Sequence, residues 1–199
     1  MFRRASLALL ILLVQGCGKE QSTADFGLEL RKPPAWTYVS GGVGGAQGDE
    51  VRYDAAALSK AIANHATAPL FALLKRAPPQ KGMNPTFGLS LDRDAHTRGQ
   101  TPLALLELRV KAASENGPFQ VTEPVSVTRM AGLAAARAEL RAPPQAAEPQ
   151  TRVRLHLVVI DDVTLLMAAT DAVSGDDEAS AAFEQILGSV RFPGVRPAR

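Results

Sequence analysis

Apolar and polar residues alternate over several segments of the chain, as they do in half-buried β-strands. The longest alternation covers residues 151–160, and Asp161-Asp162 then makes a two-residue turn into a further apolar stretch, as in a β-hairpin. Shorter alternations predict strands over residues 26–30 and 85–91, and we further expect strands over residues 36–39, 119–130, 132–141 and 163–170.

Three other segments carry apolar residues at helical spacing. We expect helices over residues 54–75, 101–117 and 176–188. Thr101 can cap the second helix, because it precedes a proline. The third begins with three acidic residues, which suit the positive end of a helix dipole. In the first, Pro69 is expected to kink or interrupt the helix.

The start of the chain differs from all of these segments. Arg3 and Arg4 precede an apolar run over residues 5–14. A charged start followed by about ten apolar residues is typical of a secretory signal, and the run is too short to span a bilayer as a helix. We therefore expect residues 1–16 to be a signal peptide.

The apolar run ends in Leu13-Val14-Gln15-Gly16-Cys17, which resembles the lipobox of bacterial lipoproteins. In that family a diacylglyceryl group is attached to the cysteine and a peptidase cuts before it. Gln15 departs from the small or aliphatic residue usual at its position, so an ordinary secretory signal with an incidental cysteine is the alternative. The resemblance implies a lipid on Cys17. The residue directly after the cysteine is Gly18 and not an aspartate. By the same resemblance, this implies the outer membrane, with the domain facing the periplasm.

Composition and charge narrow the class of protein. Cys17 is the only cysteine, so an internal disulfide is excluded. Without Arg3 and Arg4, 20 basic residues face 20 acidic ones, and this balance gives no electrostatic case for nucleic acid. The 199 residues suffice for one domain. We expect a lipidated N-terminus and polar tether over residues 17–25, a single domain over 26–192, and a C-terminal tail over 193–199.

Three short motifs point to a fold. Residues 26–38 resemble the opening F-x-L…P…W of PsbP-like domains, and residues 183–192 resemble their closing F…I…S-(apolar)-x-F. Residues 125–139 are similar to their central hairpin. The resemblance implies an α+β fold, in which a central antiparallel β-sheet is packed by helices in α/β/α layers. It implies little about activity, because such domains mostly act as accessory or assembly factors.

The sequence lacks the motifs of common enzymes. The glycine-rich residues 41–48 have no P-loop lysine, and Gln47 stands where a dinucleotide fingerprint needs its third glycine. We expect these residues to form a flexible loop. No G-x-S-x-G or H-E-x-x-H motif is present, and three histidines leave little for acid–base catalysis. We therefore expect no enzyme activity, no catalytic residue and no cofactor.

A metal site is conceivable at one strand end. Asp92, Asp94 and His96 alternate, so an extended backbone would point all three side chains to one side, with oxygen and nitrogen donors. A solvated strand end explains the same residues more simply, so no metal is expected. His65, on the apolar stripe of the first helix, is expected to pack in the core.

A candidate ligand face lies on the strand over residues 151–160. Arg152, Arg154 and His156 share its polar side. Cations beside a histidine disfavour its protonation, which would suit a neutral base or an anion-binding face. If Arg137 and Glu139 lie on a neighbouring strand, cross-strand ion pairs explain the same residues without a ligand.

The leading hypothesis is a membrane-anchored lipoprotein with a soluble, non-enzymatic binding or assembly domain, and with an envelope protein as its expected partner. A first alternative is a metal- or anion-dependent enzyme or ligand-binding module that uses Asp92, Asp94 and His96, or His156. A second is a carrier of a small apolar ligand, which would need an apolar cavity of a few hundred Å³.

Overall fold

The structure is a computed structural model. It describes residues 24–40, 45–64, 69–78, 82–93, 99–144, 149–175 and 177–195. Its helices are α1 (Ala55–Asn64), α2 (Pro102–Asn116) and α3 (Asp177–Ser189). Its strands are β1 (Leu28–Arg31), β2 (Thr37–Ser40), β3 (Gly45–Gln47), β4 (Glu50–Tyr53), β5 (Phe71–Leu74), β6 (Thr86–Arg93), β7 (Gln120–Met130), β8 (Leu133–Ala142), β9 (Thr151–Ile160) and β10 (Val163–Ala172).

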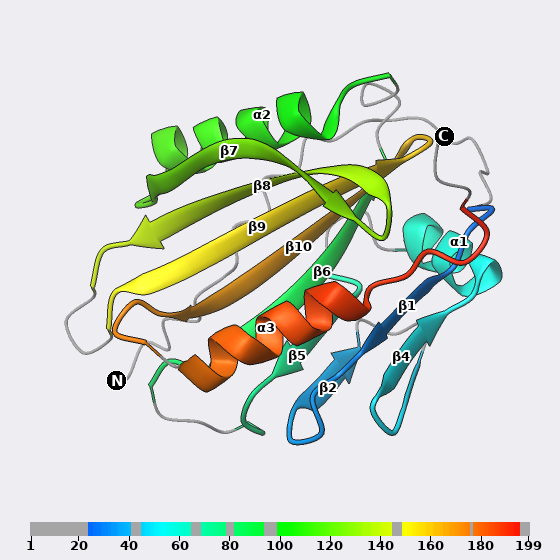
Figure 1. Cartoon of the computed structure of the whole chain (residues 1–199), viewed down its shortest axis with the longest axis horizontal. Coiled ribbons are helices and arrows are strands. Elements are labelled where there is room, and N and C mark those ends of the chain that lie inside the picture. Colours follow the sequence, from blue (N-terminus) through cyan, green and yellow to red (C-terminus); the bar gives the residue numbers. More distant parts are fainter. Residues whose placement is uncertain are drawn as a thin grey trace.

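The strands form two antiparallel sheets. The large sheet has seven strands in the order β2-β5-β6-β10-β9-β8-β7, and the small sheet has three in the order β1-β4-β3. Helix α2 covers one face of the large sheet over β7, β8 and β9, whereas α3 lies with β1 on the opposite face (Figure 1). The chain therefore has the α+β fold that the sequence predicts, a central antiparallel sheet between helical layers.

Two hydrophobic clusters hold these layers together. The smaller one lies under α2, where Leu106 is fully buried against β8 and β9. The larger one lies on the other face, where Phe183 of α3 packs edge-on against Trp36, with ring centroids 5.4 Å apart. Trp36 is therefore a core residue, only 5% exposed, as the alternation around it suggests.

The small sheet is closed by a segment far away in the sequence. The Gly27 backbone N–H donates to the Pro193 carbonyl over 2.7 Å. Glu29 and Arg191 exchange two backbone hydrogen bonds of 2.8 and 3.0 Å, which makes an isolated β-bridge. Beyond them, the Ser189 hydroxyl accepts from the Arg31 backbone N–H over 2.8 Å. The end of α3 is thus fixed against β1.

Most of the predicted elements are confirmed. Strands β7 to β10 lie within two residues of their predicted ends, with the hairpin turn at Asp161-Asp162. Thr101 caps α2, since its hydroxyl accepts from the Ala104 N–H over 3.2 Å. Helix α3 begins at Asp177 and ends at Ser189, within a residue of the prediction.

The prediction of a helix over residues 54–75 is wrong for its second half. Helix α1 ends at Asn64, and Phe71–Leu74 is strand β5, paired between β2 and β6. Phe71 and Leu73 are buried while their neighbours are less so, a period of two that a short apolar run hides. Pro69, where an interruption of the helix was expected, lies between the end of α1 and the start of β5.

The glycine-rich loop is also partly a strand. Gly45–Gln47 is β3, an edge strand paired with β4, which the sequence did not predict. Cys17, Asp94 and His96, like His65, lie outside the described residues. Within the described residues, no helix is both long enough and apolar enough to cross a membrane.

Candidate functional site

The predicted ligand face contains two arginines that converge on one buried carboxylate. Arg152 binds Asp171 through two parallel contacts, Nε to Oδ1 at 2.9 Å and Nη2 to Oδ2 at 2.8 Å. The Nη2 of Arg154 reaches the same Oδ2 at 2.8 Å. Asp171, on the neighbouring β10, is fully buried. These hydrogen bonds raise the pKa of Arg152 above its usual value.

Helix α3 completes this arrangement. The Ser180 hydroxyl accepts from Arg152 Nη2 over 3.0 Å. The Arg154 guanidinium lies 4.9 Å from the ring centroid of Phe183, a cation–π contact. Both arginines therefore help to fasten α3 to the sheet. Asp171 partly compensates the charges of both arginines inside the protein. Their positions are therefore accounted for without an external anion.

His156 lies beside this network on the same strand. Burial, followed by the charges of Arg137 and Arg154, lowers the pKa of His156 to about 4. Register places Arg137 of β8 directly opposite His156, and Glu139 opposite Arg154, as the cross-strand alternative required. The imidazole is therefore neutral near pH 7, as the sequence suggested.

Arg137, which lies opposite His156, is a cation on this face without an acidic partner among the described residues. Glu139 is engaged by the Thr122 hydroxyl at 3.0 Å and by Arg141 Nη2 at 3.2 Å. The Arg137 side chain is exposed and makes no hydrogen bond or ion pair within the described residues. The ligand face of Arg152, Arg154 and His156 stays a prediction, and its accessible cation is Arg137.

The conceivable metal site is described only in part. Asp92 forms an ion pair with Arg109 of α2, with 2.8 Å between Oδ2 and Nη2. This pair ties α2 to β6. The described residues contain no group of three or more histidine, cysteine, aspartate or glutamate side chains placed to hold a metal.

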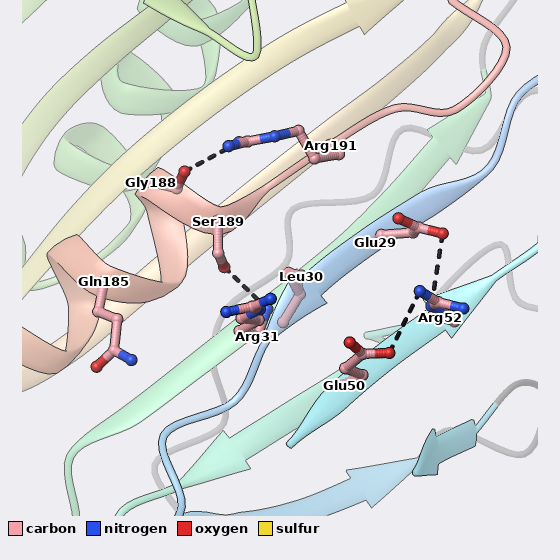
Figure 2. A pocket seen from close by; sticks show the side chains of 9 residues that line it. All are labelled: Glu29, Leu30, Arg31, Glu50, Arg52, Gln185, Gly188, Ser189 and Arg191. Atoms are coloured by element: carbon pink, nitrogen blue, oxygen red, sulfur yellow. Dashed lines mark hydrogen bonds and ion pairs between the residues drawn. The ribbon is translucent and has the colours of Figure 1, made fainter. Parts of the chain in front are cut away.

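A pocket that the sequence did not reveal lies between the small sheet and the end of α3 (Figure 2). Its volume is about 530 Å³. It is lined by Glu29, Leu30, Arg31, Glu50, Arg52, Gln185, Gly188, Ser189 and Arg191. Because five of these nine residues are charged, the pocket does not supply the apolar cavity that a carrier of apolar ligands needs.

Charged side chains give the pocket two unlike sides. On one side Arg52 stands between two carboxylates, 3.5 Å from Glu29 and 3.3 Å from Glu50. On the other side Figure 2 shows Arg31 of β1 beside the end of α3, which carries Gln185. The predicted first strand places Glu29 on its polar side. Glu50 and Arg52 could not be placed beside it, because β4 was not predicted.

Comparisons with known proteins bear on the fold. No family model matches the chain, and no curated protein matches its sequence. Among solved structures, it is similar to LpqN, a protein involved in cell envelope biogenesis of Mycobacterium tuberculosis, with a TM-score of 0.55, 15% identity and 83% of each chain covered. It is also similar to CyanoP, the cyanobacterial PsbP of Synechocystis, with a TM-score of 0.50, 10% identity, and 89% of this chain and 98% of that chain covered.

These likenesses define the class of fold. The domain has the PsbP-like arrangement of an antiparallel sheet between helices, as the three sequence motifs implied. At 15% identity or less, the similarity concerns the fold alone.

Proposed function

We propose that the chain is a membrane-anchored lipoprotein whose α+β domain binds a ligand or partner in the cell envelope and catalyses no reaction. The observation that carries this proposal is the lipobox-like Leu13-Val14-Gln15-Gly16-Cys17, placed directly after the apolar run. A lipid on Cys17 provides an anchor, since each buried methylene contributes about 0.8 kcal/mol and several chains hold a protein that a single chain would not.

The position of the first described residue, Ala24, is compatible with a membrane anchor on Cys17. Ala24 is buried, and its backbone N–H donates to the Ser59 hydroxyl of α1 over 2.7 Å. Six residues separate Cys17 from Ala24, so the seven steps between them reach at most about 25 Å. An anchor on Cys17 would therefore hold the domain close to the membrane surface.

Two further observations support a binding role in the envelope. LpqN, which has a similar fold, takes part in cell envelope biogenesis. In this chain, the buried charged groups of the large sheet face one another, as Arg152 and Arg154 face Asp171. These contacts, together with Ser180 of α3, account for the charged groups by the packing of α3 on the sheet. The outer membrane, with the domain facing the periplasm, is the location that Gly18 favours by resemblance.

Replacing the lipidated residue tests the anchor. In cells fed a labelled fatty acid, the wild-type chain should carry the label and sediment with the membranes. Cys17→Ser should lose the label and leave the membrane fraction, because the variant has no acyl chain to bury. Ser22→Ala, in the tether, is the matched control and should behave as wild type. Retention and labelling of Cys17→Ser at wild-type levels would refute the anchor.

Gly18→Asp tests the choice of membrane separately. By resemblance to the lipoprotein family, this variant should keep its label but shift from the outer to the inner membrane on a density gradient. An unchanged distribution of the labelled protein would contradict the outer-membrane assignment and leave the anchor standing.

A further inference from the structure

The polar pocket beside α3 is built on the outward face of the small sheet. On β1, Leu28 and Leu30 are buried, so Glu29 and Arg31 point outward. Register places Glu29 opposite Arg52 and Arg31 opposite Glu50. Two acids and two cations thus occupy four adjacent positions, where cross-strand ion pairs would neutralise all of them.

The ion pairs that form are not the symmetric ones. Glu50 lies 3.3 Å from Arg52, its neighbour along β4, rather than on Arg31 across the ladder. Glu29 also contacts Arg52, at 3.5 Å. Two carboxylates therefore share one cation, which leaves one negative charge in excess. The Arg31 guanidinium is exposed and has no hydrogen bond or ion pair among the described residues.

Arg191 does not neutralise the excess negative charge. Its Nη1 donates to the carbonyls of Gly188 and Val190, over 2.9 and 2.7 Å, at the end of α3. There it compensates the negative end of the helix dipole. The pocket consequently presents an unpaired cation, Arg31, and a separate site of excess negative charge at Glu29 and Glu50.

Main-chain contacts fix the strand that carries Arg31 and Glu29. The Arg31 backbone is held by Ser189, whose hydroxyl also donates to the Ile186 carbonyl over 2.7 Å. The Glu29 backbone is held by both hydrogen bonds to Arg191. The backbone of both β1 residues is therefore fixed, so their side chains leave the strand at defined positions beside α3.

We propose that this pocket binds a small zwitterion, an amino acid or short peptide with free termini, whose carboxylate meets Arg31 and whose ammonium meets Glu29 and Glu50. Arginine suits a carboxylate because its planar donors match the two oxygens. The volume of about 530 Å³ accommodates such a ligand. The site supplies a ligand class for the binding domain proposed above. The ligand site depends on the pocket and not on the anchor. A Cys17→Ser variant, which carries no lipid, would therefore keep the site intact.

Alanine, L-alanyl-L-alanine and trialanine are the probes. Each is titrated into the Cys17→Ser chain at low salt, and backbone amide signals are followed by NMR. We expect at least one probe to bind with a Kd below about 10 mM and to move the signals of Arg31 and Ser189. For that probe, the N-acetyl derivative, which lacks the ammonium, and the C-terminal amide, which lacks the carboxylate, should each bind about tenfold more weakly.

Variants locate the two charges. Arg31→Gln keeps the backbone N–H that Ser189 accepts and should weaken the best probe about tenfold, and Glu50→Gln should do so to a similar degree. Arg76→Gln removes an exposed arginine outside the pocket and should bind as before. The proposal is overturned if no probe binds below about 10 mM, if the blocked derivatives bind as well as the free peptide, or if Arg31→Gln has no effect.

Discussion

His156 should make the stability of the domain depend on pH in a defined window. In the folded chain the pKa of His156 is about 4, whereas a histidine in the unfolded chain titrates near 6.5. As the pH falls from 6.5 to 4, the unfolded state takes up a proton that the folded state refuses. The free energy of unfolding therefore falls with decreasing pH in this window and is fully retained above about pH 6.5.

The size of the effect follows from the width of the window. Two and a half pH units at about 1.4 kcal/mol per unit give a loss of about 3.5 kcal/mol. This is an upper bound, because the ring is only half-buried and solvent screens part of the repulsion from Arg137 and Arg154. Such a loss is a large share of the stability of an ordinary domain.

Urea unfolding of the Cys17→Ser chain measures this loss. The single tryptophan, Trp36, is buried against Phe183 and reports unfolding by fluorescence. Between about pH 7 and about pH 4.5 the parent should lose about 2 kcal/mol more than His156→Gln, which cannot take up the proton. Arg137→Gln should show an intermediate loss, since removing one cation raises the pKa of His156. Equal pH dependence in the parent and His156→Gln would refute the argument.

Two other substitutions test the framework around this site. Asp171→Asn should lower the free energy of unfolding by about 3–5 kcal/mol, measured by urea unfolding, because Arg152 and Arg154 lose their shared carboxylate; a loss below about 1 kcal/mol would contradict that role. Thr101→Ala should cost about 1 kcal/mol through loss of the α2 N-cap. Thr101→Ser keeps the hydroxyl and should restore most of it, and equal losses in both variants would speak against the cap.

Those parts of the fold that are set by long local patterns could be predicted from sequence. Strands β7 to β10 each span ten or eleven residues, and in β9 the alternation is long enough to be recognised without a partner. Strand β5 has four residues, and in so short an apolar run the period of two cannot be told from a turn of helix. Strand β3 depends on its pairing with β4 rather than on its side chains.

The candidate sites show the same division. That Arg152, Arg154 and His156 share one side of a strand follows from a period of two, and the structure agrees. Their partner Asp171 lies one residue past the predicted end of its strand, and only the register of β9 with β10 brings it opposite Arg152. The polar pocket depends on contacts between β1 and the end of α3 that no local pattern encodes.

The closure of the small sheet has a consequence for how the chain is made. Arg31 and Ser189, which hydrogen-bond directly, are 158 residues apart in the sequence. Contacts of such separation form late, because a long loop has to close before they contribute. While the ribosome is still adding residues, β1 has no partner at the end of α3, and the domain cannot complete its native packing. Late completion of this kind suits a chain that is predicted to leave the cytoplasm unfolded.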